Sequence, residues 1–188
     1  MLKTISLTII ILFSLSAAAL AQKPKPTPKP SKTLPPNKVA ASSAAKCEGN
    51  LLTAAEITEL LSAHNKARDD QKLPPLTWDC TLAKSAQDWA SKSVFQHQDT
   101  YYGENMFVAS SPTEKIETVT KQWMKEKSNW DNKTATCATG KTCTHYTQIM
   151  WNTTAKVGCG INRNATGKWK VIVVCNYDPA GNSGGPAY

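Results

Sequence analysis

Apolar residues recur at helical spacing in two stretches that follow helix-capping patterns. The first stretch begins after Thr53-x-x-Glu56, a capping box, and predicts a helix that ends before Pro74-Pro75. The second stretch begins after Asp79 and predicts another helix. The apolar positions of this second helix are Leu82, Ala83, Ala86, Trp89 and Ala90. Both helices should turn their apolar residues toward a core.

A third helix is predicted to open at Ser111-Pro112-Thr113-Glu114. Ser111 would be the N-cap, Pro112 is tolerated in a first turn, and Glu114 stands at the capping-box position. The apolar stripe of this helix consists of Ile116, Val119 and Trp123. This stripe would pack the third helix against the same core as the first two.

The last part of the chain has the pattern of β-strands. Residues 157–161 and 169–175 are β-branched and apolar, and turn residues separate them, which predicts an antiparallel hairpin. Residues 171–174 lack alternation, so that strand should be covered on both faces. A short strand is also predicted at residues 105–109. The resulting α+β architecture has helices on both sides of a small, mainly antiparallel sheet.

The first residues have the composition of an export signal. Lys3 supplies a positive charge, residues 5–15 are mostly apolar, and Ala19-Leu20-Ala21 is the small-x-small pattern that a signal peptidase reads. The apolar stretch is short for a membrane-spanning helix, which needs about 20 residues. We therefore expect residues 1–21 to be a cleaved signal peptide, with an uncleaved anchor as the alternative. The mature protein would be secreted, periplasmic or attached to the cell surface.

Residues 22–46 differ in composition from the rest of the chain. They hold six of the eleven prolines and six lysines, with no acidic and no aromatic residue. Such a segment predicts a disordered, PPII-like linker, because each proline removes a backbone donor and the lysines repel one another. A plain linker is the interpretation that this composition favours. An electrostatic tether to an anionic cell surface is the alternative.

The charge of the chain does not favour a nucleic-acid partner. The whole chain has 22 Lys and Arg against 14 Asp and Glu, a net charge of +8. Residues 1–46 hold seven of the lysines and no acid, so residues 47–188 have 15 basic against 14 acidic side chains. The basic character belongs to the N-terminal segments, and we expect no nucleic acid to bind the folded part.

Residues 47–188 have the length of one domain and contain all six cysteines. In an exported chain an even number of cysteines favours disulfides, and six cysteines allow fifteen pairings. The short loops Cys137/Cys143 and Cys159/Cys175 are attractive pairs, and they would leave Cys47 with Cys80. A zinc site is the competing interpretation, but no cysteine pair has the spacing of a zinc knuckle.

Three histidines and one glutamate are the first candidates for chemistry. His64 lies on the apolar stripe of the first helix, which predicts a hydrogen-bonded structural residue. His97 lies in a loop before Gly103-Glu104-Asn105, and His145 opens the segment of residues 145–151. Glu126 points with the apolar stripe of the third helix. A carboxylate there needs a partner or a raised pKa, unless it has turned to the rim of the helix end.

Six short motifs resemble those of the CAP (or SCP) superfamily, which comprises cysteine-rich secretory, antigen 5 and pathogenesis-related proteins. They follow the order of that family over most of residues 60–188. They are His64-Asn65-x-x-Arg68, Leu76-x-Trp78-Asp79, Gly103-Glu104-Asn105, His145-Tyr146-Thr147-Gln148-Ile149-Met150-Trp151, Val157-Gly158-Cys159 and Cys175-Asn176-Tyr177-x-Pro179-x-Gly181-Asn182. The resemblance implies an α-β-α sandwich at residues 47–188, of the plant-like pathogenesis-related type.

The resemblance also implies a central cleft lined by His97, Glu104, Glu126 and His145. Family members can hold a divalent metal in this cleft, often zinc, mainly through the two histidines. His97 and His145 are therefore the implied metal ligands, with Glu104 and Glu126 as further candidates. This chain has Gln98 where the family usually has serine after the loop histidine.

A second departure from the family is Thr144, which stands where the family usually has glycine, arginine or an acidic residue before the cleft histidine. The disulfides Cys137–Cys143 and Cys159–Cys175 suit plant-like members of the family. Cys47–Cys80 would then be a variation of this chain.

The function that the resemblance implies is extracellular binding without catalysis, by a monomer. Some family members bind sterols, fatty acids or other lipids on apolar surface, and such a surface could include Phe95, Tyr101, Tyr102 and Phe107. Packing of the core is the alternative role for each of these aromatic residues. A metal-dependent hydrolase or protease is a second hypothesis, although no serine stands in an elbow motif. A defence or signalling effector that acts on a cell-surface receptor is the third.

Three N-glycosylation sequons are present. They are Asn132-Lys133-Thr134, Asn152-Thr153-Thr154 and Asn164-Ala165-Thr166. These sequons have a consequence only in a eukaryotic secretory pathway.

Overall fold

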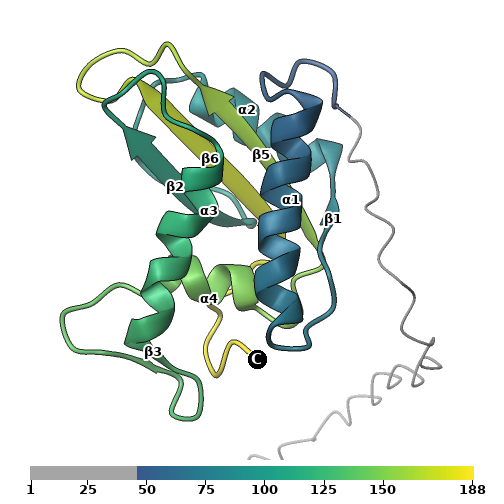
Figure 1. Cartoon of the computed structure of the whole chain (residues 1–188), viewed down its shortest axis with the longest axis vertical. Coiled ribbons are helices and arrows are strands. Elements are labelled where there is room, and N and C mark those ends of the chain that lie inside the picture. The colour runs from purple at the N-terminus through teal and green to yellow at the C-terminus, as the bar shows by residue number, and fades with distance from the viewer. Residues whose placement is uncertain (1–45) are drawn as a thin grey trace, which may run out of the picture. The chain divides into compact units, whose positions relative to one another are not determined.

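The computed structural model describes residues 46–188 (Figure 1). The predicted signal peptide and all but the last residue of the predicted linker lie outside the described residues. No helix within residues 46–188 is both long and apolar enough to cross a membrane.

A four-stranded sheet forms the middle layer of the fold. Its strands, in spatial order, are β1 (Thr77–Trp78), β5 (Lys156–Asn162), β6 (Val171–Asp178) and β2 (Gly103–Ala109). β6 pairs antiparallel with both β5 and β2, whereas the short β1 pairs parallel with β5. The predicted hairpin and the predicted strand at residues 105–109 are thus confirmed. A separate two-stranded ribbon consists of β3 (Trp130–Asp131) and β4 (Thr136–Cys137).

Helices cover both faces of the four-stranded sheet (Figure 1). One face packs against α1 (Ala54–Asp69), α3 (Glu117–Met124) and α4 (Thr144–Met150), and the other packs against α2 (Cys80–Ala90). A short 3-10 helix, η1 (Lys125–Asn129), continues from α3. The α-β-α sandwich is therefore confirmed.

The central strand β6 explains why two separate cores exist. Val171 and Val173 lie in the core shared with α1, α3 and α4, whereas Ile172 and Val174 lie in the core shared with α2. Successive side chains of a strand point to opposite faces, so a fully apolar run needs cover on both sides. All four of these residues are buried, as the absence of alternation predicted.

Two glycines of β5 allow α2 to lie close to the sheet. A Cβ atom added to Gly158 would lie 2.2 Å from the backbone nitrogen of Ala83. A Cβ atom added to Gly160 would lie 2.3 Å from Cα of Gln87. Any side chain at either position would push α2 away from the sheet, which explains the glycines of the Val157-Gly158-Cys159-Gly160 segment.

The first two helices begin where their capping patterns predicted. The hydroxyl of Thr53 accepts a hydrogen bond from the backbone of Glu56, whose side chain bonds back to the Thr53 backbone. The carboxylate of Asp79 accepts from the backbone amides of Thr81 and Leu82 at the start of α2. Each cap satisfies amides that a helix start leaves without partners.

The start predicted for the third helix is wrong. Residues 111–114 form a turn, in which the Glu114 amide donates to the Ser111 carbonyl at 3.4 Å, and α3 begins only at Glu117. The N-cap of α3 is Ile116, and no side chain caps it. A Ser-Pro-x-Glu segment satisfies a turn as well as a helix start, so the local pattern did not distinguish the two.

Three disulfides join all six cysteines of the described domain. Cys47–Cys80 ties the start of the domain to α2, and Cys159–Cys175 bridges β5 and β6. Cys137–Cys143 closes a short loop between β4 and α4. The last of these bonds places the first turn of α4 beside the β3–β4 ribbon.

Candidate functional site

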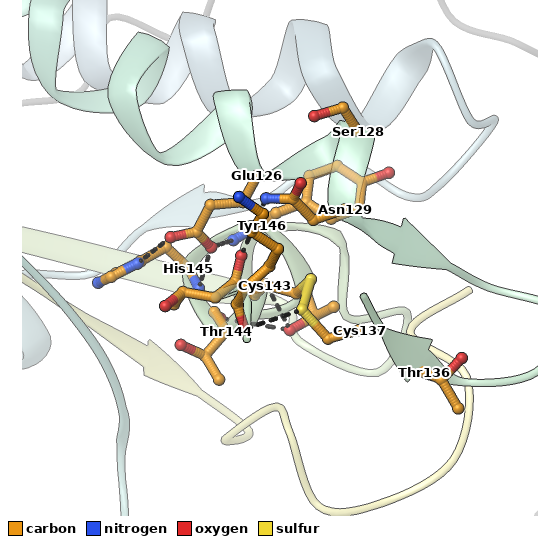
Figure 2. Close-up of a disulfide and its surroundings, with 12 residues drawn as sticks. Glu126, Ser128, Asn129, Thr136, Cys137, Cys143, Thr144, His145 and Tyr146 are labelled. Carbon is orange, nitrogen blue, oxygen red and sulfur yellow. Dashed lines mark hydrogen bonds and ion pairs between the residues drawn. A yellow bond between two sulfur atoms is a disulfide. The ribbon is translucent and has the colours of Figure 1, made fainter. Parts of the chain in front are cut away.

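Glu126 and His145 form a tight pair at the start of α4 (Figure 2). The carboxylate Oε1 of Glu126 lies 2.6 Å from Nδ1 of His145. The other oxygen, Oε2, accepts hydrogen bonds from the backbone amides of His145 and Tyr146 at 3.0 and 3.2 Å. Glu126 therefore binds the histidine side chain and caps the helix that carries it.

The position of this pair follows from the elements around it. Figure 2 shows the Cys137–Cys143 disulfide directly beside the start of α4, which fixes where the helix amides point. The ring of His145 is parallel to that of Trp123, with ring centroids 6.1 Å apart and an interplanar angle of 6°. Glu126 belongs to η1 rather than to α3, so the continuation of α3 as a tighter helix aims its carboxylate at α4.

The surroundings of Glu126 favour its ionised form. Burial alone would raise the pKa of this carboxyl, but the hydrogen bond and charge of His145 and the two amides of α4 lower the pKa below its usual value. Because its partner is a carboxylate, Nδ1 of His145 carries a hydrogen and donates a hydrogen bond to Oε1 of Glu126. Nε2 of His145 is then the ring nitrogen that remains for a further partner.

His97 and Glu104 form a second pair on the β2 side of the sheet. Nδ1 of His97 lies 2.6 Å from Oε1 of Glu104, and the same oxygen accepts from the Gln98 amide at 3.3 Å. The side chain of His97 is 68% exposed, whereas that of Glu104 is only 5% exposed. Oε2 of Glu104 is buried and has no hydrogen-bond partner within residues 46–188. A buried carboxylate oxygen without a partner is costly, so this pair has unused binding capacity.

Gln98 takes over a structural role beside this second pair. Its side-chain amide donates to the side chain of Asn176 at 2.9 Å, and Asn176 in turn donates to the hydroxyl of Ser85 on α2. The residue in which the chain departs from its family therefore links the His97 loop to β6 and α2. Nothing in the sequence pattern indicated this link.

The two pairs do not come together as one metal site. In the part of the chain that the structure describes, no three His, Cys, Asp or Glu side chains lie close enough together to hold an ion. The residue types suit zinc, because a zinc-binding histidine usually donates a hydrogen bond from its second ring nitrogen to a carboxylate. The positions of these residues do not suit zinc, because zinc sites have at least three protein ligands close together.

A cavity of about 380 Å³ opens beside the Glu126–His145 pair and is called the cleft below. Its apolar lining consists of Phe95, Met106, Phe107, Val108 and Trp123. Its polar lining consists of Gln122, Lys125, Glu126, Asn129 and His145. Neither His97 nor Glu104 lines it. Of the predicted aromatic residues, Phe95 and Phe107 line the cleft, whereas Tyr101 and Tyr102 pack against each other with ring centroids 4.5 Å apart.

A buried hydrogen-bond network joins α1, β6, β2 and α4 near the cleft. His64 is fully buried, bonds to the Leu60 carbonyl at 2.7 Å and to the Tyr177 hydroxyl at 2.8 Å, and is structural, as predicted. The side-chain amide of Asn105 donates to the Tyr177 hydroxyl and to the His145 carbonyl. Asn105 thereby fixes β2 to α4, a role that the sequence did not reveal.

The charge state of His64 follows from its burial. Desolvation lowers the pKa of His64 to about 4, although the hydrogen bond to Leu60 acts in the opposite direction. The imidazole is therefore neutral near pH 7. It donates from Nδ1 to the Leu60 carbonyl and accepts at Nε2 from Tyr177.

Comparison with known proteins assigns the family. The family model "CAP: Cysteine-rich secretory protein family" matches residues 61–177. Pathogenesis-related protein 1A of Nicotiana tabacum is 38% identical over 128 residues, which are 66% of this chain and 75% of that protein. Pathogenesis-related protein 1A1 of Solanum lycopersicum is 41% identical over 126 residues, which are 65% of this chain and 70% of that protein.

Solved structures agree with this assignment. The crystal structure of NaASP2 with Zn2+ superposes with a TM-score of 0.65 at 26% identity, over 76% of this chain and 90% of that one. The structure of Schistosoma mansoni venom allergen-like protein 4 superposes with a TM-score of 0.61 at 26% identity, over 73% of this chain and 95% of that one. With the six motifs, the fold and both sets of relatives in agreement, the chain belongs to the cysteine-rich secretory protein (CAP) family.

Proposed function

We propose that this protein is a secreted, defence-related member of the CAP family that binds an apolar ligand in its cleft without catalysis. The pathogenesis-related relatives support a role in defence. The three disulfides suit an extracellular protein, because such bonds persist in oxidising compartments. The apolar lining of the cleft supports an apolar ligand.

The single observation that carries the proposal is the division of the cleft into an apolar wall and a polar end. Five apolar side chains line it, and the Glu126–His145 pair stands among its polar residues. Binding sites for small molecules typically combine apolar walls with a few fixed polar groups. A ligand with an apolar body and one polar head, such as a sterol or a fatty alcohol, matches this division.

The tautomer of His145 adds a preference for the head group. With Nδ1 donating to Glu126, Nε2 is the ring nitrogen of His145 that is left for a ligand, and no hydrogen bond within residues 46–188 uses it. A ligand hydroxyl can either donate to that atom or accept from it, whereas an ionised carboxylate can only accept and would lie near the Glu126 carboxylate. We therefore propose that hydroxyl-headed lipids bind more tightly than fatty acids near neutral pH.

The test is saturable binding of a fluorescent sterol and of a fluorescent fatty acid to the mature chain. Phe95 lines the cleft and is 56% exposed, so Phe95→Ala should weaken sterol binding about tenfold through lost apolar contact. Tyr101→Ala is the matched control, because Tyr101 is 81% exposed and does not line the cleft. Absence of saturable binding, or equal loss in both variants, would contradict the proposal.

Hydrolysis is the alternative that the Glu126–His145 pair invites, since an oriented histidine can act as a general base. Within residues 46–188 every cysteine is in a disulfide, and no serine hydroxyl bonds to His145. The described residues therefore supply a base and an orienting carboxylate, but no serine or cysteine nucleophile bonded to the base. Ester and peptide hydrolysis by the wild type, lost in His145→Ala, would overturn the non-catalytic proposal.

A divalent metal bound by His97 and His145 stays a separate proposal. Each imidazole is oriented by a carboxylate, and Oε2 of Glu104 is without a partner in the described domain. Because the placed residues offer no third ligand, we derive no chemistry from a metal. Calorimetry with zinc chloride on the wild type and on His97→Ala/His145→Ala tests it. Stoichiometric binding that the double variant loses would support the metal proposal, and no binding by the wild type would end it.

We further propose that the mature protein is a monomer that encounters its ligand or a cell-surface component outside the cell. The near-neutral charge of residues 47–188 gives no support to a nucleic-acid partner. Light scattering after size exclusion tests the monomer. Binding to intact cells that survives His145→Ala would favour a surface receptor as partner over a ligand of the cleft.

A further inference from the structure

The three sequons differ in what their asparagine side chains touch. Asn152 and Asn164 are exposed, and within residues 46–188 neither side-chain amide makes a hydrogen bond. Asn132 is half-buried in the turn between β3 and β4, and its side chain makes several hydrogen bonds. The sequence pattern is the same at all three positions, so only the structure separates them.

The carboxamide of Asn132 binds the backbone of residues 187 and 188. Its Oδ1 accepts from the amide of Ala187 at 2.9 Å and from the amide of Tyr188 at 3.3 Å. Its Nδ2 donates to the main-chain oxygen of Tyr188. Oδ1 also accepts from the indole nitrogen of Trp130 at 3.1 Å, which fixes the orientation of the carboxamide.

Further contacts show that residues 187–188 are docked on the domain. Ala187 is fully buried, and its carbonyl accepts from the Asn152 backbone amide at 2.8 Å. The hydroxyl of Tyr188 lies 2.8 Å from that of Tyr146, and the two rings meet edge to face. Asn132 supplies the side chain that recognises the backbone of this docked segment.

We propose that the carboxamide of Asn132 is a clamp for residues 187–188, and that the folded protein carries N-linked glycans at Asn152 and Asn164 but not at Asn132. A glycan and the clamp require the same atoms of Asn132. The two free side chains, by contrast, can be modified without the loss of any hydrogen bond that the described residues make.

The chemistry of glycan transfer explains this exclusion. Nδ2 attacks the anomeric carbon of a lipid-linked oligosaccharide diphosphate: a C–N bond forms, the anomeric C–O bond breaks, one proton leaves Nδ2, and the lipid diphosphate departs. The product is a secondary amide, whose trans form places the sugar on the same side as Oδ1. The N–H of Nδ2 that donates to Tyr188 lies on the same side of the carboxamide as Oδ1, because both atoms bind the backbone of one residue, Tyr188. A sugar in the trans amide would therefore replace the hydrogen of this bond.

Glycopeptide mapping of the full chain, secreted from a eukaryotic host, tests which sequons are used. Enzymatic removal of glycans converts each occupied asparagine to aspartate, and we expect this conversion at positions 152 and 164 and not at 132. Thr134→Ala destroys the sequon but keeps Asn132, so it should leave the total glycan mass unchanged. Loss of one glycan mass in Thr134→Ala, or occupancy of Asn132 equal to that of Asn164, would overturn the proposal.

Release of Tyr188 by a carboxypeptidase tests the clamp on protein that is produced to end at Tyr188 and is made without glycans. Asn132→Ala removes the hydrogen bonds to residues 187–188 and should speed release at least about tenfold. Asn164→Ala is the matched control and should match the wild type. Near-ultraviolet circular dichroism verifies that each variant is folded, and an unchanged rate in folded Asn132→Ala would overturn the clamp.

Discussion

The two His–Glu pairs have the same separation of 2.6 Å and quite different surroundings. In the Glu126–His145 pair both side chains are largely buried, with exposures of 16% and 27%. Both carboxylate oxygens of Glu126 are bonded. In the His97–Glu104 pair the histidine is 68% exposed, and one buried oxygen of Glu104 has no partner in the described domain. Both oxygens of Glu126 are therefore used by α4 and His145, which leaves Nε2 of His145 as the free atom of that pair, whereas Glu104 itself keeps a carboxylate oxygen without a partner.

The elements that carry the pairs explain this difference. A helix start offers backbone amides that need acceptors, so a carboxylate facing α4 finds two donors in addition to the histidine. Glu104 lies on β2, an edge strand whose amides are used by β6 or face outward. Among residues 46–188, the donors to its carboxylate are then His97 and the backbone amide of Gln98, both in the loop of His97. The two pairs thus have the same distance between nitrogen and oxygen, although their carboxylates accept different sets of hydrogen bonds.

His64 differs from the histidines of both pairs, because it is fully buried and bonds to a carbonyl and a hydroxyl instead of a carboxylate. Its pKa is lowered to about 4, so the unfolded chain binds a proton that the folded chain does not between about pH 6.5 and about pH 4. Stability should therefore fall by about 3 kcal/mol as pH falls through this range, and level off below it. Unfolding in urea, followed by tryptophan fluorescence at a series of pH values, measures this loss.

His64→Gln should remove this part of the pH dependence, since the amide cannot be protonated in the range. Asn164→Gln is the control, because Asn164 is exposed and neither side chain binds a proton in this range. A profile that changes equally in both variants would show that burial of His64 is not the cause.

Removal of each glutamate tests the comparison directly. Glu126→Ala leaves the amides of His145 and Tyr146 without their acceptor and should cost about 2 kcal/mol of unfolding free energy. Glu104→Ala loses bonds from His97 and Gln98 but also removes a buried oxygen without a partner, so it should cost about 1 kcal/mol or less. Urea unfolding at neutral pH measures both, and equal costs would break the distinction between the pairs.

Acid should weaken the Glu126–His145 pair in a predictable range. Burial opposes ionisation of Glu126, but His145 and the α4 amides outweigh it and lower the pKa of this carboxyl below its ordinary value of 4.5. A carboxyl with a lowered folded pKa stabilises the fold above its unfolded pKa, and this contribution is lost as pH falls through the folded pKa. The loss should therefore begin below about pH 4.5.

The measurement uses a His64→Gln background, so that His64 does not contribute. Glu126→Gln in that background should be less stable than its parent at about pH 5, and the gap should narrow toward about pH 3. A gap that stays constant over this range would mean that the charge of Glu126 does not stabilise α4.

The sequence predicted the parts of this molecule that depend on local patterns. The capping residues Thr53 and Asp79 marked helix starts correctly, because the bonds that they make lie within three residues. The start proposed at Ser111 was wrong, because a turn uses the same residues. The strands were predictable from unbroken apolar runs, since only a doubly covered strand tolerates them.

The candidate site was predictable only in part. The resemblance selected the four cleft residues, but it did not reveal that they form two pairs with one buried oxygen left over. Asn105 and Asn132 act through contacts with residues that are 40 or more positions away in the chain. Such contacts leave no periodic signal, because they depend on how complete elements pack.

The smallest expected effect is the energetic coupling between the two histidines. No group of three donor side chains gathers in the described domain, so His97→Ala and His145→Ala should change the unfolding free energy independently. Without metal the double variant should equal the sum of the single variants within about 0.5 kcal/mol, as for residues without shared partners. Urea unfolding of the four proteins in a chelating buffer measures the coupling.

Urea unfolding of the same four proteins in zinc chloride shows whether the two histidines bind one ion together. A single ion held by both imidazoles would stabilise only the wild type, so the coupling should rise above about 0.5 kcal/mol as zinc is added. Coupling that stays near zero at saturating zinc would contradict the metal proposal and leave the two pairs as separate features. Coupling already present in chelator would contradict the structure instead, because it would require the His97 loop to approach His145 without an ion.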